Sequence, residues 1–306
     1  MKRLLVTGKH GFVGSTISQL VKTSPSLGEW ELAEIPVAFD LRDRSAVIEL
    51  VRETAPDAVF HLAAQSWVPE AMRDPEATLQ VNLIGTLHLL EALRDAGFSG
   101  TMVFASTGDV YGYVPVEELP IAESRLPTPR NPYSVSKLAA EALCHQWAVT
   151  DGVRVIAARP FNHIGPGQSE RFVVSDFARQ VAEIKLGRRE PVVRVGDIDV
   201  TRDFTDVRDV VHAYFGLLRD GAPGELYNVC SGEERSIRSI LERLAELAGV
   251  EIEVSQDPER LRKSEQRRVR GDPAKIRRTT GWSATTVLDE SLLSMLDHWS
   301  EEITHG

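Results

Sequence analysis

Cysteine is scarce in this sequence, since the 306 residues include only Cys144 and Cys230. Two cysteines cannot form a disulfide framework or a metal site built from cysteine pairs, so we expect a protein of a reducing compartment, the cytoplasm. Long apolar runs are also lacking, because no stretch approaches the roughly 18 residues that cross a membrane. The apolar run near the amino terminus is too short for a signal peptide, and we expect no membrane association.

Basic charge is in deficit as well, with 35 Lys and Arg against 45 Asp and Glu and a net charge of −10. A dedicated nucleic-acid-binding protein needs a basic surface, so this balance argues against nucleic acid as a partner. Hydrophobic residues make up 42% and charged residues 26% of the chain, which is ordinary for a protein with a packed core. The length predicts one large domain or two modest ones.

Short apolar runs alternate with longer helical patterns through the first half of the chain. Strands are predicted by the runs at residues 3–7, 30–35, 57–64, 101–105 and 153–158. Helices are predicted at residues 12–22 and 44–54, in a long stretch that ends near Gly97, and after Pro132. Near-continuous apolar strands between helices are typical of a parallel sheet covered on both faces. We therefore predict an α/β fold with a doubly wound parallel sheet.

After Pro160 the pattern changes to loops rich in glycine, proline and charge. Helices at 175–186 and 237–248 and a strand at 225–229 follow, which indicates a smaller second lobe. We predict a first domain over residues 1–160 that is rejoined by residues of about 204–230. The second lobe then consists of residues 161–203 and 231–306.

A glycine-rich turn follows the first predicted strand and opens the first predicted helix. Gly8, Gly11 and Gly14 have the spacing G-x-x-G-x-x-G. Glycine at such places allows a tight turn and close approach of the backbone to a pyrophosphate, and the helix amino terminus attracts the phosphates. The pattern favours a dinucleotide site, and the alternative is a glycine turn without a ligand.

A hydroxyl and a tyrosine–lysine pair form the second candidate site. Thr107 follows a predicted strand, at the edge of the sheet where ligands bind in such folds. Tyr133 and Lys137 lie one helical turn apart and share a face. A nearby ammonium favours the phenolate and lowers the pKa of a tyrosine, so the combination predicts acid–base chemistry. A lone Tyr-x-x-x-Lys could also be an exposed helix pair.

These segments resemble the extended short-chain dehydrogenase/reductases that act on nucleotide sugars. That family has a Rossmann fold with a smaller C-terminal substrate-binding lobe. The resemblance covers nearly the whole chain, through residues 7–14, 62–65, 82–86, 106–112, 133–137, 159–163 and 202–207. Within the family, residues 161–168, 227–232 and 262–272 look like the members that reduce GDP-4-keto-6-deoxy-D-mannose.

The resemblance implies a role for each matching residue. Tyr133 would donate a proton, Lys137 would hold the nicotinamide ribose and lower the tyrosine pKa, and Thr107 would hydrogen-bond the reacting sugar oxygen. The cofactor, NADP(H) or NAD(H), would be bound by Gly8, Gly11, Phe12, Val13, Gly14, Asp40, Leu41, Leu62, Ala63, Ala64, Tyr133 and Lys137. The GDP-sugar would be bound by Thr107, Asn162, Arg202, Arg262 and Glu265.

The choice between the two cofactors stays open. No basic residue lies between Lys22 and Arg42 to mark a site for a 2′-phosphate, although Lys9 in the glycine turn could serve. Glu34 lies 20 residues after Gly14, near the place where this fold carries an acid for the adenosine ribose.

Other charged and polar residues carry weaker hypotheses. We expect no metal site, because His61, His163 and His212 lie in unrelated segments without ligand spacing. The basic residues between 260 and 270 could be a surface paired with the surplus acids, a nucleic-acid patch or a diphosphate clamp. We assign the clamp to Arg262 and most of the others to the surface.

The resemblance also implies a homodimer, in which the helices after Asn82 and after Pro132 form a four-helix contact. The candidate contact residues are Ile84, Leu87, Leu90 and Leu138, and the alternative is that they face the sheet.

The implied activity is reduction of the C4 keto group of GDP-4-keto-6-deoxy-D-mannose to GDP-D-rhamnose. The alternatives are a nucleotide-sugar 4,6-dehydratase or 4-epimerase of the same family, and a catalytically silent sensor of cofactor or nucleotide sugar. A dehydratase needs one more acid–base group. In dehydratase relatives a glutamate stands two positions after the catalytic threonine, and an aspartate sometimes stands before that glutamate. This chain has Asp109 in the place of the glutamate and Gly108 in the place of the aspartate. The shorter Asp109 side chain predicts weak dehydration at most.

Overall fold

A parallel sheet of six strands forms the centre of the first lobe. The computed structural model describes residues 1–260 and 266–305 of the chain. The sheet has the order β2-β1-β3-β4-β5-β9, and every neighbouring pair of strands is parallel. Its strands are β1 (Lys2–Thr7), β2 (Trp30–Leu32), β3 (Ala58–His61), β4 (Thr101–Ala105), β5 (Arg154–Pro160) and β9 (Leu226–Val229). The predicted α/β fold with a doubly wound parallel sheet is confirmed.

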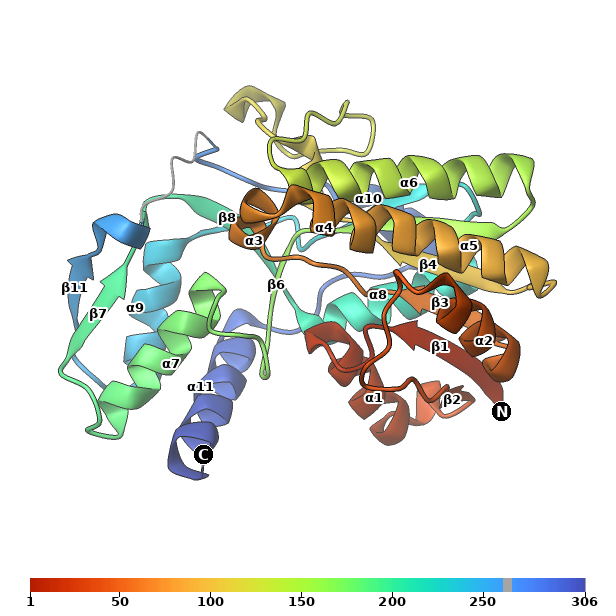
Figure 1. Cartoon of the computed structure of the whole chain (residues 1–306). Helices are drawn as coiled ribbons and strands as arrows, with labels where there is room; N and C mark the ends of the chain where they lie inside the picture. The colour runs from red at the N-terminus through yellow and green to blue at the C-terminus, as the bar shows by residue number, and fades with distance from the viewer. Residues whose placement is uncertain (261–265, 306) are drawn as a thin grey trace.

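Alternating side chains of the strands explain the two helical layers. Leu5 of β1 packs with residues of α2, α5 and α6, whereas its neighbours Leu4 and Val6 pack with residues of α1 and α8. Successive strand residues point to opposite faces, so strands covered on both faces are apolar almost throughout. Figure 1 shows the sheet between α5 and α6 on one side and α1 and α8 on the other. These helices are α1 (Phe12–Thr23), α2 (Arg44–Thr54), α5 (Gly85–Asp95), α6 (Pro132–Thr150) and α8 (Val207–Asp220).

The long helix that the sequence predicts up to Gly97 is divided into shorter segments. They are α3 (Val68–Arg73), α4 (Pro75–Leu79), a π-helical turn (Gln80–Ile84) and α5. The division falls at Pro75, because proline has no N–H with which to continue the preceding helix. The Asp74 carboxylate accepts a hydrogen bond of 2.9 Å from the Ala77 N–H and so begins the next helix.

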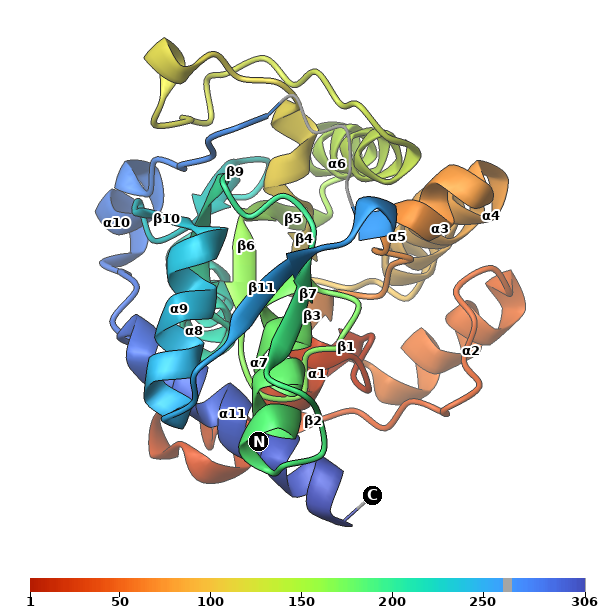
Figure 2. The ribbon, with the colours of Figure 1, turned by 90° about the vertical axis from the view of Figure 1, so that its left-hand side faces the viewer.

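The second lobe is built around its own apolar core. Residues of α7, α9, α11 and β7 form this core, and β7 pairs with β11. Figure 1 shows these elements to one side of the central sheet, and Figure 2 shows them facing the viewer. The helices are α7 (Val173–Lys185), α9 (Ile237–Ala248) and α11 (Leu288–His305). The strands are β6 (Asn162–Ile164), β7 (Val192–Val195), β8 (Thr201–Asp206), β10 (Glu234–Ser236) and β11 (Glu253–Gln256).

Two segments that follow parts of the second lobe in the sequence belong to the first lobe. β9 extends the central sheet beside β5, and α10 (Ala274–Thr280) packs against α8 and β9. Ile276 and Trp282 join the core of the first lobe, although the sequence places residues 231–306 in the second. Their apolar side chains fill space beside α8, which sequence periodicity does not show. The division of the chain at 160, 204 and 230 stays a prediction. Single 3₁₀ turns are found at Pro25–Leu27, Gly108–Tyr111, Val116–Glu118 and Pro258–Arg260.

Candidate functional site: a glycine turn and a tyrosine–lysine pair at the carboxyl edge of the sheet

The glycine turn lies where the strand order of the sheet reverses. The chain passes from β1 to β2 on one side and then to β3 on the other side of β1. Ligands of open α/β sheets bind beyond the carboxyl ends of the strands at such a reversal. The turn after β1 therefore occupies the position that the fold makes available for a ligand.

The backbone of this turn is too close to its neighbours for side chains. Gly8 has φ +78°, and a Cβ there would lie 2.9 Å from the backbone nitrogen of Ala63. A Cβ at Gly14 would overlap the carbonyl oxygen of Gly8. Gly11 begins α1 without a side-chain cap, so the first N–H groups of the helix are available to an anion. This arrangement fits a pyrophosphate against the turn.

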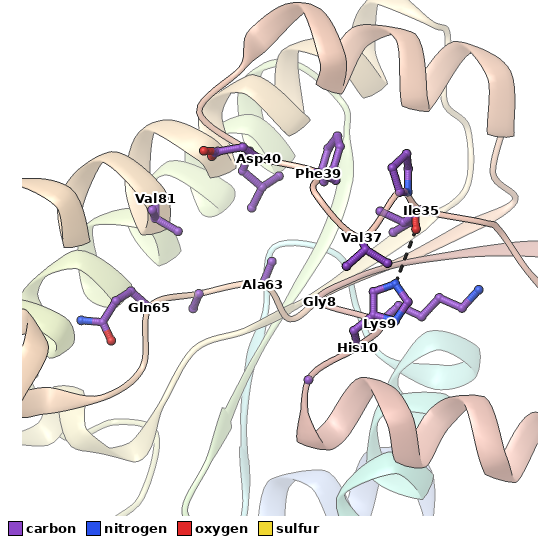
Figure 3. Close-up of a pocket in the computed structure, with 14 residues that line it drawn as sticks. Gly8, Lys9, His10, Ile35, Val37, Phe39, Asp40, Ala63, Gln65 and Val81 are labelled. Atoms are coloured by element: carbon purple, nitrogen blue, oxygen red, sulfur yellow. Dashed lines mark hydrogen bonds between the residues drawn. The ribbon is translucent and has the colours of Figure 1, made fainter. Parts of the chain in front are cut away.

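A cavity of about 430 Å³ opens beside the glycine turn. Figure 3 shows it between the turn and the segment after β2, with Ala63 and Gln65 along one side. Its lining comprises Gly8, Lys9, His10, Gly11, Ile35, Pro36, Val37, Phe39, Asp40, Leu41, Ala63, Ala64, Gln65 and Val81. The structure thus brings the glycine turn together with the predicted cofactor residues Asp40, Leu41, Ala63 and Ala64.

The side chains of three other predicted cofactor residues point away from this cavity. Val13 and Leu62 pack against the core on the α1 and α8 side of the sheet. The Phe12 ring stacks on His163, with 5.9 Å between the ring centroids. Phe12 and Val13 can contact a cofactor in this cavity only through their backbone at the start of α1.

The predicted catalytic residues come from two adjacent elements. Thr107 follows β4, and its hydroxyl accepts a hydrogen bond from the Asp109 N–H at 3.2 Å. Tyr133 and Lys137 stand on the first turns of α6, which begins with Pro132 and a reciprocal cap between Asn131 and Ser134. Both features fix the start of a helix, so the position of Tyr133 is set by local sequence.

The surroundings of Tyr133 keep its phenol protonated. Burial raises the pKa of Tyr133 above its ordinary value, and the negative charge of Asp109 raises it further. A hydrogen bond with the Thr107 hydroxyl opposes these effects without outweighing them. The sequence predicts a lowered pKa because of Lys137, and the structure shows the reverse, since burial dominates. The phenol next to Thr107 therefore carries a proton at neutral pH, and its raised pKa makes it a weaker acid than an exposed tyrosine.

Lys137 is a buried cation. Its side chain is 2% exposed, and its ammonium lies 4.4 Å from the centre of the Phe104 ring. Burial lowers the pKa of Lys137 to about 8, although the nearby acidic groups of Cys144 and Glu141 raise it. The lysine therefore stays largely charged at neutral pH.

Buried polar residues that the sequence did not single out as functional hold the site together. The Asn82 amide donates to the Ser136 hydroxyl at 2.9 Å and to the Gln65 carbonyl at 3.0 Å. Ser136 donates in turn to the backbone carbonyl of Tyr133 at 2.7 Å. The network joins the cavity wall at Gln65 to the helix that carries Tyr133. The full burial of its polar side chain marks Asn82 as a residue that supports the site. A single sequence does not show which side chains are buried, so the sequence analysis did not find it.

His61 belongs to a second buried network. Its ring nitrogens lie 2.7 Å from the Thr7 hydroxyl and 2.9 Å from the Thr86 hydroxyl. Thr86 donates its own proton to the Asn82 carbonyl, so His61 donates to Thr86 and accepts from Thr7. Burial lowers the pKa of His61 to about 3, and the charge of Lys137 adds to this effect. His61 is a neutral link between strands and not a proton-transfer group.

The predicted substrate residues are partly described. Arg202 on β8 is half-buried, and burial lowers its pKa while the charge of Asp109 raises it. Asp109 thus acts on both Tyr133 and Arg202, which places the second lobe's arginine near the tyrosine. Asn162 is exposed on β6, next to β8 in the same sheet. Arg262 and Glu265 lie outside the described residues.

Three arginines of the basic run pair with acids, as the surface interpretation predicts. Arg260 binds Asp176, Arg267 binds Asp197 and Arg268 binds Glu234. All three of these arginines therefore form ion pairs with acidic residues of the protein itself.

The fold and the arrangement of this site are those of an extended short-chain dehydrogenase/reductase. Residues 33–295 match the model of the GDP-mannose 4,6 dehydratase family, and the chain belongs to that family. It is 51% identical over 302 residues to GDP-6-deoxy-D-mannose reductase of Pseudomonas aeruginosa. The aligned residues make up 99% of this chain and 98% of the relative.

Solved structures show the same similarity in fold. The structure of RMD from Pseudomonas aeruginosa complexed with NADPH superposes with a TM-score of 0.93 at 50% identity, covering 99% of this chain and 100% of that one. The structure of Thermus thermophilus UDP-glucose 4-epimerase with NAD has a TM-score of 0.84 at 32% identity, with 97% and 98% covered.

Proposed function

We propose that this chain is an oxidoreductase that reduces the C4 keto group of GDP-4-keto-6-deoxy-D-mannose to GDP-D-rhamnose. A nicotinamide cofactor, NADPH or NADH, supplies the hydride when it is bound in the cavity beside the glycine turn. The protonated phenol of Tyr133 gives the proton to the C4 oxygen, and Thr107 orients that oxygen. Lys137 holds the nicotinamide ribose, and Asn162, Arg202, Arg262 and Glu265 bind the nucleotide part of the substrate.

The space at Gly108 is the observation that carries this proposal. A Cβ at this position would lie 3.1 Å from the Phe161 ring, so a larger side chain requires the ring to move by a few tenths of an ångström. This is the place where some dehydratase relatives have an aspartate. Reduction needs only a hydride, a proton and orientation of the ketone, and the chain supplies the last two through Tyr133 and Thr107. Dehydration needs a further acid–base group, and Gly108 supplies no side chain for one, while a larger residue there would have to push the Phe161 ring aside.

Asp109 favours the dehydratase as the second candidate. Its carboxylate raises the pKa of Tyr133 by its charge and is therefore close to the proposed site. Aspartate is one methylene shorter than the glutamate of dehydratase relatives, and a misplacement of about 1 Å can cost roughly 10²-fold in rate. The catalytically silent sensor ranks lower, because a sensor does not need a protonated phenol beside Thr107. The 4-epimerase ranks lower, because the chain is 51% identical to a reductase and 32% identical to a 4-epimerase.

Two parallel assays separate these functions. One contains the full chain with GDP-4-keto-6-deoxy-D-mannose and NADPH or NADH, and the other contains GDP-mannose with oxidised cofactor. We expect a product only in the first, with one reduced cofactor consumed per sugar. Efficient formation of the 4-keto sugar in the second assay would establish the dehydratase, and cofactor binding without turnover in either would favour the sensor.

We also propose a homodimer formed through α5 and α6. Leu90 cannot take part, because it is fully buried in the core between α5 and the sheet. Ile84, Leu87 and Leu138 are half-buried and remain candidates, although Leu87 and Leu138 also pack in part against core residues of this lobe. Light scattering after gel filtration at micromolar protein should give twice the mass of one chain, and Leu87→Glu should lower it. A monomeric mass for the parent protein would reject this proposal.

The proposed location is the cytoplasm, which is supported by two buried cysteines that are both unpaired, Cys144 and Cys230. Across residues 1–260 and 266–305, no helix combines the length and the apolar character that crossing a bilayer requires.

A further inference from the structure

A second cavity, of about 370 Å³, opens between the carboxyl end of β9 and α10. Figure 2 shows β9, β10 and α10 together on one flank of the molecule. The lining of the cavity includes Ser231, Gly232 and Glu233 after β9, Arg270 and Gly271, and Arg277 of α10. It shares no lining residue with the cavity beside the glycine turn, and none of these residues has a part in the proposed reduction.

The wall of this cavity is fixed from behind by Asp203 of β8. One oxygen of the fully buried Asp203 carboxylate accepts hydrogen bonds from the Ser231 N–H at 2.9 Å and the Ser231 hydroxyl at 2.6 Å. Its other oxygen accepts from the N–H groups of Gly232 at 3.0 Å and Gly271 at 3.1 Å. Successive residues of a strand point to opposite faces, so Arg202, which the proposed function assigns to the substrate, points away from this wall. The second cavity and the proposed substrate site therefore lie on opposite faces of β8.

The two arginines that line this cavity have no acidic partner, in contrast to their neighbours. Arg267 and Arg268 each form an ion pair with an acid of the second lobe. In the part of the chain that the structure describes, neither Arg270 nor Arg277 forms an ion pair, and the Arg277 guanidinium donates a hydrogen bond of 3.2 Å to the Ser231 carbonyl oxygen. The cavity therefore holds two guanidinium charges without a carboxylate in contact with either.

The Arg270 guanidinium also has a buried nitrogen without a partner. Its Nε is shielded from solvent and finds no hydrogen-bond acceptor among the described residues. The charge of Arg270 acts on Glu234, but that carboxylate is already bound by another arginine. The Arg270 backbone is held, since its carbonyl oxygen accepts from the Ile121 N–H at 2.8 Å. A buried donor without an acceptor costs free energy, and an oxyanion in the cavity would supply the acceptor after a rotation of the side chain.

The balance of charge in the cavity is positive. Among the described residues that line it, Glu233 is the acid, and an ion pair with Arg235 offsets its charge. The carboxylate of Asp203 lies behind the backbone of the wall, and the four hydrogen bonds described above take up its two oxygens. An anion that enters the cavity therefore meets two guanidinium groups and no unpaired carboxylate of the lining.

We propose that this cavity binds a phosphate group, either free phosphate or the phosphate of a small organic molecule, between Arg270 and Arg277. The planar guanidinium presents parallel N–H groups to two oxygens of a phosphate, which a lysine cannot do. The volume of about 370 Å³ is within the range of roughly 300–1,000 Å³ that small-molecule sites have. Glu233 in the same lining can accept hydrogen bonds from the hydroxyl groups of an organic phosphate. The proposal does not depend on the reductase activity.

Calorimetric titration tests this site in the full chain saturated with NADPH and GDP, which occupy the places that the proposed function gives to other phosphate groups. The probes are inorganic phosphate and glycerol 3-phosphate at constant ionic strength, because salt screens such contacts. We expect one binding site per chain. Arg270→Met and Arg277→Met should each weaken the tighter-binding probe roughly 10- to 100-fold, the range for loss of a charge-assisted contact. Tighter binding of glycerol 3-phosphate would identify an organic phosphate as the ligand, and tighter binding of inorganic phosphate would identify the free ion.

Two further variants make the test specific. Arg52→Met removes an arginine of α2 whose side chain is 74% exposed, and it should leave the Kd of either probe within about threefold of the parental value. Glu233→Gln removes the acid of the cavity and releases Arg235, so it should tighten either probe roughly two- to fivefold, a gain that misfolding cannot produce. The Kd of NADPH, measured by fluorescence titration, should stay within about threefold in all four variants and so show that they are folded.

The proposal is overturned if the parent binds neither probe, or if Arg270→Met and Arg277→Met both bind as the parent does. It is also overturned if Arg52→Met weakens binding as much as they do. The result is separable from the proposed activity. Phosphate binding with the expected pattern, in a protein that reduces no 4-keto sugar, would keep the second cavity as a phosphate site and reject only the reductase.

Discussion

Tyr133→Phe should lower kcat for reduction of the 4-keto sugar by roughly 10²- to 10⁴-fold, the usual contribution of a positioned acid–base group. The phenol is the group placed to give a proton to the C4 oxygen, and it holds that proton at neutral pH because even the ordinary pKa of a tyrosine is about 10. Phenylalanine keeps the ring and its packing. The Kd of NADPH, measured by fluorescence titration, should therefore stay within about threefold of the parental value.

Tyr113→Phe is the matched control, since Tyr113 is 46% exposed and lies outside the proposed site. Its kcat should equal that of the parent. Unchanged kcat in Tyr133→Phe would remove Tyr133 from the chemistry. A loss of cofactor binding in the same variant would instead assign it a structural role.

Lys137→Met should weaken the cofactor roughly 10- to 100-fold, because a charge-assisted contact with the nicotinamide ribose is lost. The same change should raise the Tm of the cofactor-free protein at pH 7. Lys137 is buried, and burial lowers its pKa to about 8 from an ordinary value of 10.5, so its charge destabilises the folded state. Methionine has a similar length and carries no charge.

The effect on stability has a defined pH window. Between pH 8 and 10.5 the folded protein has released the Lys137 proton while the unfolded chain still holds it, so stability rises with pH in this range. The advantage of Lys137→Met should be full below pH 8 and vanish above pH 10.5. Thermal melts at pH 7 and 10.5 measure it, with Lys185→Met, an exposed lysine of α7, as control. A lower Tm for Lys137→Met at pH 7 would contradict the buried-charge account.

The strands buried on both faces and the second-lobe helices α7 and α9 were predictable from sequence, whereas the strands of the second lobe were not. The apolar runs of β3, β4 and β5 are continuous because two helical layers cover them, so their composition alone indicates a strand. β8 contains charged residues such as Arg202 and Asp203, and it reads as a loop in the sequence. Trp282 joins the first-lobe core from a segment assigned to the second, a contact that no local pattern encodes.

The same distinction holds at the site. The spacing of Tyr133 and Lys137 on one helix is local, so the sequence shows that they share a face. The pKa of Tyr133 depends on burial and on Asp109, which the fold supplies, and the prediction of its direction was wrong. The pairing of Lys9 with Glu34 is also tertiary, since it depends on where β2 ends relative to β1. The roles of the predicted site residues stay predictions until the variants are measured.

The final position of the transferred hydrogen tests the central claim most directly. The full chain is given GDP-4-keto-6-deoxy-D-mannose and NADPH or NADH in which deuterium replaces both hydrogens at C4 of the nicotinamide, and the product is examined by NMR. The account predicts GDP-D-rhamnose with one deuterium at C4 of the sugar and none at C6. A product without deuterium, or with deuterium at C6, would contradict it.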